Sequence, residues 1–244
     1  MTDITFSDSG AGRPFLLLHG GAGPQSVAGF ADLLTASGAR VLVPVHPGFG
    51  GTPRPDSLHT MRDLARAYLG LLDEQDLTGV TVIGNSIGGW IAAEMAIAAS
   101  PRISGVVLVD AGGLKLDDHP AADFFSLTPD QITDLAYYDP GKFRVDPSTL
   151  SDEQKAVLAA NRAALAVYGG TSLTDPGLLG RLSEVTVPVL VVWGEADRIY
   201  PVEHGEAFAK AIPGARLVMI PAAGHLPQLE APRALLETVL DFAR

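Results

Sequence analysis

A serine between glycines stands where a predicted strand meets a predicted helix. Residues 84–88 read GNSIG; they follow the apolar, β-branched run 80–83 and precede the helical pattern of residues 90–96. A serine on such a sharp turn exposes its hydroxyl at the carboxyl end of a sheet, and flanking glycines prevent collisions there. The pentapeptide alone is unspecific, but with this flanking context it predicts Ser86 as a nucleophile.

A serine nucleophile needs a base, and the base needs an acid that orients it. His225 follows a loop that leaves the last apolar run, residues 217–220. Asp197 lies in a loop that leaves the run before it, residues 187–193. Both loops are expected at the sheet edge that carries Ser86, so we predict that these three residues form a catalytic triad.

Asp110 is the alternative acid. It ends the apolar run 106–109, so it also lies at the carboxyl end of a predicted strand. Its other expected role is to cap the turn into residues 111–113. We assign the acid to Asp197 and keep Asp110 as the alternative.

Attack on a carbonyl creates an oxyanion that needs N–H donors. Residues 19–23 read HGGAG and leave the apolar run 15–18, so their main chain can turn tightly. We predict the N–H of Gly21 as one donor. The N–H of Ile87 is the second, because it lies at the start of the helix after Ser86.

The elements that position these residues alternate along the chain. Six apolar runs have strand length: residues 15–18, 41–43, 80–83, 106–109, 187–193 and 217–220. Continuous apolar character indicates burial on both faces, as in a parallel sheet covered by helices. Helices are expected at about residues 27–37, 60–75, 88–99, 202–211 and 231–243. The alternation predicts an α/β fold with a mostly parallel, doubly wound sheet.

The alternation breaks between the fourth and fifth apolar runs. Two helices are expected there, with Thr128 and Ser151 as their N-caps, and no strong strand. We therefore expect a core of residues 1–111 and 185–244 and a small helical cap of residues 112–184 over the carboxyl edge of the sheet.

Composition restricts the classes of partner. The net charge of −11 argues against nucleic acid and anionic membranes, and no apolar run has the length of a membrane span. Cysteine is absent, and the N-terminus shows no basic or apolar leader, so we expect a cytoplasmic protein. No pair of histidines has metal-ligand spacing on one helix, so no metal is predicted.

Five motifs together resemble the α/β-hydrolase superfamily over essentially the whole chain. They are HGG at 19–21, PGFG at 47–50, GNSIGG at 84–89, GEAD at 194–197 and GH at 224–225. The resemblance implies the α/β-hydrolase fold, a cap that shapes the substrate pocket, and no cofactor. The chain order Ser86, Asp197, His225 is also the order of that superfamily.

Within the superfamily, the chain is similar to the meta-cleavage-product hydrolases, which cleave carbon–carbon bonds. These enzymes carry an asparagine before the serine, as in Asn85, and a cap arginine for the substrate carboxylate, for which Arg162 is the candidate. They usually have a tryptophan after the catalytic histidine, where this chain has Leu226. His46 is a second departure, because relatives commonly have aspartate there.

We expect a serine hydrolase of the carboxylesterase type that cleaves a small ester, or a related acyl compound, through an acyl-enzyme. The first alternative is hydrolysis of a carbon–carbon bond in a vinylogous diketone, with Asn85 and Arg162 holding the substrate. The second is a ligand receptor that retains the triad and turns over slowly. Tyr137 is a candidate for lining the pocket, and packing within the cap is its other expected role. A small-molecule substrate is the expected partner, and a homodimer remains open.

Overall fold

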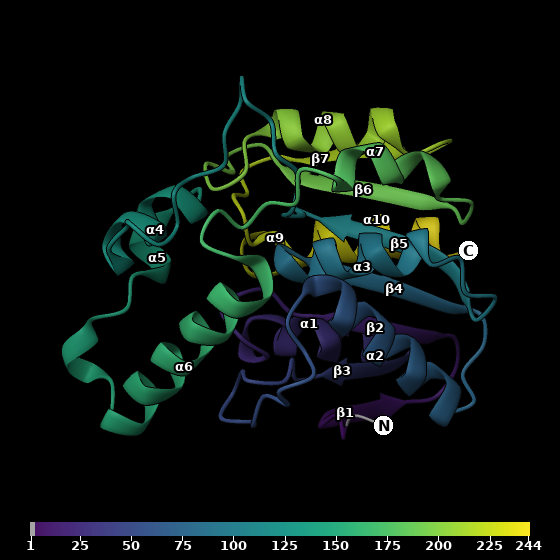
Figure 1. Cartoon of the computed structure of the whole chain (residues 1–244), viewed down its shortest axis with the longest axis horizontal. Coiled ribbons are helices and arrows are strands. Elements are labelled where there is room, and N and C mark those ends of the chain that lie inside the picture. The colour runs from purple at the N-terminus through teal and green to yellow at the C-terminus, as the bar shows by residue number, and fades with distance from the viewer. Residues whose placement is uncertain (1–2) are drawn as a thin grey trace.

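The computed structural model describes residues 3–244 and contains a seven-stranded sheet (Figure 1). The strands are β1 (Phe6–Gly10), β2 (Pro14–Leu18), β3 (Arg40–Pro44), β4 (Val80–Asn85), β5 (Ile103–Val109), β6 (Val189–Gly194) and β7 (Arg216–Ile220). Their order across the sheet is β1-β3-β2-β4-β5-β6-β7. β1 runs antiparallel to β3, and the other neighbouring pairs are parallel. The prediction of a mostly parallel sheet is confirmed.

Helices cover both faces of the sheet (Figure 1). They are α1 (Gln25–Ala36), α2 (Met61–Glu74), α3 (Ile87–Ile97), α8 (Val202–Ala211), α9 (Pro227–Glu230) and α10 (Pro232–Phe242). Successive strand residues face opposite sides, so Leu16 packs with α2 and α3 while Phe15 packs with α1 and α10. Burial on both faces explains why the central strands are apolar throughout.

A helical insertion separates β5 from β6. It contains α4 (Pro129–Ala136), α5 (Pro140–Phe143), a 3-10 turn (Pro147–Thr149), α6 (Asp152–Gly169), α7 (Leu178–Arg181) and a second 3-10 turn (Leu182–Glu184). Thr128 and Ser151 cap α4 and α6 as predicted, each in a capping box with the glutamine three residues on. α4, α5 and α6 stand out from the sheet at the left of Figure 1, whereas α7 packs beside α8.

The sequence did not predict β1. Its residues, FSDSG, contain a single large apolar side chain and are mostly exposed, so they form no apolar run. It pairs as an edge strand with β3, and the Asp8 carboxylate accepts two hydrogen bonds from Arg40 across the pair. Charged side chains are typical of edge strands. Within residues 3–244, no helix has both the length and the apolar character that crossing a membrane requires.

Candidate active site

Ser86 occupies a strained turn between β4 and α3. Its φ of 58° and ψ of −120° lie outside the common regions for a residue with a side chain. Its N–H donates to the Val109 carbonyl at 3.0 Å, and its carbonyl accepts from the Gly112 N–H at 2.9 Å. Such a conformation persists only when the surroundings hold it in place, and strained residues of this kind cluster at functional sites.

The glycines on either side of Ser86 are needed for close backbone contacts. A Cβ at Gly84 would lie 2.0 Å from the Gly88 carbonyl oxygen, and one at Gly88 would lie 2.4 Å from the Leu18 carbonyl oxygen. Both distances are far below contact, so any side chain would push α3 away from β4 or β2. The spacing of the GNSIG motif is therefore explained by the packing of the turn.

His225 and Asp197 lie together at the carboxyl edge of the sheet. The His225 Nδ1 is 2.8 Å from the Asp197 Oδ2, and both side chains are buried. The Asp197 Oδ1 accepts from the N–H groups of Ile199 at 2.8 Å and Tyr200 at 3.0 Å, which hold the carboxylate in place. A carboxylate can only accept, so this contact places the imidazole proton on Nδ1 and leaves Nε2 free to act as a base.

The main chain of His225 is tied to two other parts of the site. Its N–H donates to the Ala136 carbonyl at the end of α4 at 2.7 Å. Its carbonyl accepts from the Asn85 Nδ2 at 3.0 Å, and the Gln228 Nε2 donates to the Asn85 Oδ1 at 3.1 Å. Asn85 thus links the segment of the nucleophile to the loop of the base, and both ends of its amide have protein partners.

Sequence reasoning missed Gln228 and the link from α4 to His225. Gln228 lies three residues after His225 in α9 and is buried, a spacing that could have drawn attention to it. Glu230, at the end of α9, accepts from the N–H groups of Gly224 at 2.7 Å and Tyr138 at 3.1 Å. The cap and the histidine loop are therefore held together by this carboxylate.

The glycine-rich loop after β2 runs directly beside Ser86. A Cβ at Gly20 would lie 3.1 Å from the Cβ of Ser86, and one at Gly21 would lie 3.3 Å from the Cδ2 of Leu165 in the cap. Ile87 is the first residue of α3 and is buried. The structure therefore brings the loop of Gly21 and the start of α3, the two predicted sources of oxyanion donors, to the nucleophile.

A buried network of two histidines and a tyrosine braces this loop. The His46 Nε2 lies 2.8 Å from the His19 carbonyl, the His46 N–H donates to the His19 Nε2 at 3.0 Å, and the His46 Nδ1 lies 2.5 Å from the Tyr68 hydroxyl. Burial lowers the pKa of His19 to about 4 and also lowers that of His46. Both rings are therefore neutral near pH 7, and each has one N–H donor and one acceptor nitrogen. His46 is therefore a neutral partner of His19.

The two cap side chains predicted to touch substrate are engaged within the cap. The Arg162 Nη2 donates to the carbonyls of Phe124 at 3.2 Å and Phe125 at 2.8 Å, and its guanidinium lies 5.1 and 5.0 Å from the centres of their rings. Tyr137 stacks on Phe143 with ring centres 4.4 Å apart. Burial raises the pKa of Tyr137 to about 12, so the phenol stays protonated.

Asp110 lies beside the predicted acid. It is fully buried, its Oδ1 accepts from the Gly194 N–H at 2.8 Å, and polar atoms of Asp110, Asp197 and His225 all lie within 4.8 Å of one another. Within residues 3–244, these form the only group of three or more histidine and acidic side chains close enough to share a metal ion. Because His225 and Asp197 are at hydrogen-bond distance, we interpret the group as a hydrogen-bonded network.

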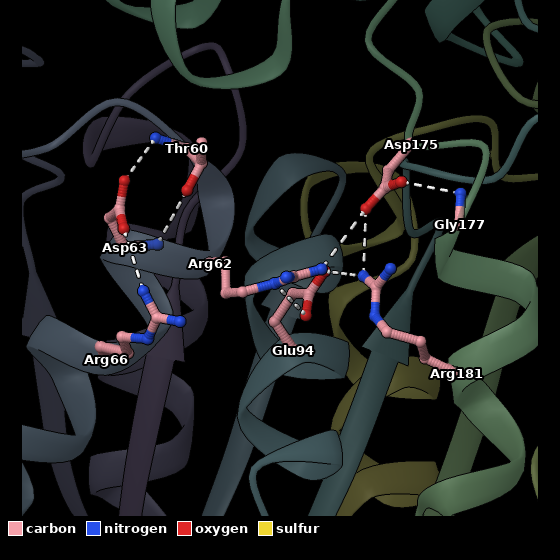
Figure 2. Close-up of polar contacts among 8 residues, drawn as sticks. All are labelled: Thr60, Arg62, Asp63, Arg66, Glu94, Asp175, Gly177 and Arg181. Carbon is pink, nitrogen blue, oxygen red and sulfur yellow. Dashed lines mark hydrogen bonds and ion pairs between the residues drawn. The ribbon is translucent and has the colours of Figure 1, made fainter.

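A second polar cluster lies farther along α3 (Figure 2). Glu94 is buried eight residues after Ser86, about 12 Å along the helix axis. Its carboxylate pairs with Arg181 of α7 at 2.5 Å and with Arg62 of α2 at 3.5 Å, and Arg181 also reaches Asp175 at 3.0 Å. These residues border or adjoin a cavity of about 520 Å³, and their ion pairs fasten the end of the insertion to α2 and α3.

A strained serine at a strand-to-helix turn, with a histidine and a carboxylate on neighbouring loops, defines a hydrolase of the α/β type. Residues 15–238 match the Alpha/beta hydrolase family. The chain belongs to this family and is a hydrolase.

Several curated relatives span nearly the whole chain. A 2-hydroxy-6-oxononadienedioate/2-hydroxy-6-oxononatrienedioate hydrolase of Cupriavidus pinatubonensis is 29% identical over 98% of this chain and 90% of its own length. A hydrolase of the same description from Dechloromonas aromatica is 30% identical with the same coverage.

Solved structures with this fold include enzymes of different names. A thermophilic esterase from Thermogutta terrifontis is 26% identical, with a TM-score of 0.77 over 99% of this chain and 94% of its own. A meta-cleavage product hydrolase, CumD, has a TM-score of 0.79 over 98% of this chain and 93% of its own at 22% identity, which shows the shared fold.

Proposed function

We propose that the protein hydrolyses small carboxylic esters through an acyl-enzyme, with Ser86, His225 and Asp197 as its triad. The observation that carries this proposal is the 2.8 Å contact between His225 and Asp197 at the sheet edge that holds the strained Ser86 turn. A histidine oriented in this way can accept a proton at Nε2, which is what a serine hydroxyl needs to become a nucleophile.

The reaction proceeds in two halves. The Ser86 Oγ attacks the ester carbonyl carbon while the His225 Nε2 takes its proton, and the N–H groups of Gly21 and Ile87 stabilise the oxyanion. Collapse of this intermediate breaks the bond to the alcohol, which leaves with the proton from His225. Water then attacks the acyl-enzyme with His225 again as base, which releases the acid and restores Ser86.

Two contacts favour an ester over a carbon–carbon substrate. A dienoate substrate carries a carboxylate that a free guanidinium would bind, but Arg162 already donates to two cap carbonyls. The Asn85 amide is likewise occupied by His225 and Gln228. Leu226 adds an aliphatic side chain where carbon–carbon hydrolases usually have tryptophan.

Carbon–carbon bond hydrolysis is the second candidate, because curated relatives at 29% and 30% identity are named as hydrolases of oxo-dienoate compounds. Within this reading, Arg162 would have to leave the carbonyls of Phe124 and Phe125 to meet the substrate carboxylate.

A substrate panel separates the two candidates. We expect short p-nitrophenyl esters to be cleaved with a kcat/KM at least about tenfold above that of a ring-fission dienoate. A dienoate that turns over faster than any ester in the panel would favour carbon–carbon hydrolysis as the function.

We also propose that the protein acts on its small-molecule substrate in the cytoplasm, which the absence of cysteine supports.

A further inference from the structure

Asp197 has acceptor capacity that its contacts do not fill. An ionised carboxylate offers about four acceptor directions on two oxygens. The N–H groups of Ile199 and Tyr200 occupy Oδ1, and His225 occupies one direction of Oδ2. One direction at the Asp197 Oδ2 is therefore left for a further donor.

Asp110 is placed to supply that donor. Its Oδ1 accepts from the Gly194 N–H, while its Oδ2 is buried and has no hydrogen-bond partner among residues 3–244. Carboxylate oxygens of Asp110 and Asp197 lie within 4.8 Å of each other. One proton on the Asp110 Oδ2 would give this buried oxygen a hydrogen-bond partner and would fill the free acceptor direction of Asp197.

We propose that Asp110 is a positioning residue: it stays protonated and donates from Oδ2 to Asp197, completing the hydrogen bonds that hold the triad carboxylate against His225. The inference rests on the triad of the proposed function, which it deepens by giving the neighbouring acid a role. The assignment uses both candidate acids, since one is the ionised member of the triad and the other its neutral donor.

The surroundings support a neutral Asp110. Burial, and then the nearby Asp197 charge, raises the pKa of Asp110 well above its usual value, and Glu230 acts in the same direction. Tyr200 and His204 face the pair from the loop and helix after β6, and burial raises the pKa of Tyr200 and lowers that of His204. Both changes favour neutral side chains, so these neighbours supply no permanent positive charge to Asp110.

The backbone also favours a short polar side chain at this position. Asp110 has a φ of 45°, in the left-handed region, and its N–H donates to the Val192 carbonyl at 3.0 Å. Aspartate and asparagine tolerate this region better than other residues with a Cβ. Asp110→Asn is therefore a close mimic: its carbonyl can accept from Gly194, and its NH2 can donate to Asp197 as the protonated acid does.

The decisive measurement is the titration of the His225 ring, monitored by NMR in the whole protein. Asp110→Asn removes no charge from a neutral Asp110, so the His225 midpoint should stay within about 0.3 pH units of wild type and kcat should fall less than about tenfold. Asp110→Leu removes the donor. Asp197 then holds the imidazolium more strongly, so the midpoint should rise by about half a unit or more, and kcat should fall more than in Asp110→Asn.

Asp76→Leu is the control for backbone strain, since Asp76 has the same φ of 45° but lies on an exposed turn. A fall of about one unit or more in Asp110→Asn would show that an ionised Asp110 had been neutralised, and would overturn the inference. An unmoved midpoint in a folded Asp110→Leu would also overturn it. If Asp110→Leu fails to fold, the change of the His225 midpoint in Asp110→Asn still decides whether Asp110 is neutral or ionised.

The titration needs no turnover, so it separates this inference from the proposed function. If the wild-type protein does not hydrolyse esters, that result would count against the proposed function alone. A triad that works but shows a lowered His225 midpoint in Asp110→Asn would count against the role of Asp110 alone.

Discussion

Two buried acidic side chains on neighbouring elements have opposite surroundings. Glu94 on α3 is 5% exposed and pairs with Arg181 and Arg62, whereas Asp110 after β5 is 0% exposed and faces a second carboxyl group, Asp197. A buried acid can be satisfied by a cation or by keeping its own proton. In this chain, the first solution occurs where the insertion is fastened to the core, and the second occurs where His225 needs an oriented anion.

The difference explains why burial alone does not identify function. The Glu94 cluster joins α2, α3 and α7 through ion pairs, and Figure 2 shows its arginines converging on the carboxylate from both sides. Its removal should change stability. The Asp197 edge has a hydrogen-bonded histidine beside a strained serine, so changes there should alter rate.

The largest expected effect is on rate at the nucleophile. Ser86→Ala and His225→Ala should each lower kcat by about 10⁴–10⁶, because each removes a group that acts in the transition state. Thermal unfolding should show little loss of folding in either variant. Retention of more than about a tenth of wild-type turnover by Ser86→Ala would show that the nucleophile lies elsewhere.

The next largest effect compares the two acids, Asp197 and Asp110, at the carboxyl edge of the sheet. Asp197→Asn should lower kcat by about 10²–10⁴, because the amide can no longer hold His225 as the anion does, while Asp110→Asn should cost less than about tenfold. Steady-state kinetics on the best ester measures both. The reverse ranking would move the triad acid to Asp110.

A third prediction concerns stability at the other buried acid. Glu94→Gln should lower the free energy of unfolding by about 2 kcal/mol, because it removes the negative charge that pairs with Arg181 and Arg62, while kcat changes less than about threefold. Denaturant unfolding measures the loss. The matched control is Asp73→Asn, whose partner is also an arginine but whose side chain is 69% exposed, and it should cost less than about 1 kcal/mol. Equal losses of unfolding free energy in Glu94→Gln and Asp73→Asn would contradict the stabilising role of the buried Glu94 ion pairs.

The smallest expected effect is in the cap. Arg162→Ala should change kcat/KM on a neutral ester by less than about threefold, because Arg162 donates to cap carbonyls and no ion pair with the substrate is lost. Kinetics on an ester and on a dienoate, measured side by side, checks this. A large loss confined to the dienoate would favour the carbon–carbon reading.

Features with a local sequence signal were predictable. The central strands are apolar because both faces are buried, and the GNSIG turn needs its glycines for close packing, so sheet and nucleophile could be anticipated. β1 could not, because an exposed edge strand needs no apolar pattern. The helix starts at Thr128 and Ser151 were predictable because a capping box is read over four residues.

Contacts between distant residues could not be predicted in the same way. The link from Asn85 to His225 spans 140 positions, and the Glu94–Arg181 pair spans 87. The sequence placed Asp110 and Asp197 at the same edge but could not show that their carboxylate oxygens lie within 4.8 Å of each other. That depends on side-chain directions set by the strained turns around them.

The most direct test of the proposed triad is covalent labelling followed by peptide mass spectrometry. A fluorophosphonate reacts with a serine only when a neighbouring base activates it. We expect one phosphonyl group per chain on the peptide that contains Ser86, with labelling strongly reduced in His225→Ala and absent in Ser86→Ala. Wild-type protein that remains unlabelled, or that is labelled equally in Ser86→Ala, would contradict the assignment of Ser86 as the nucleophile.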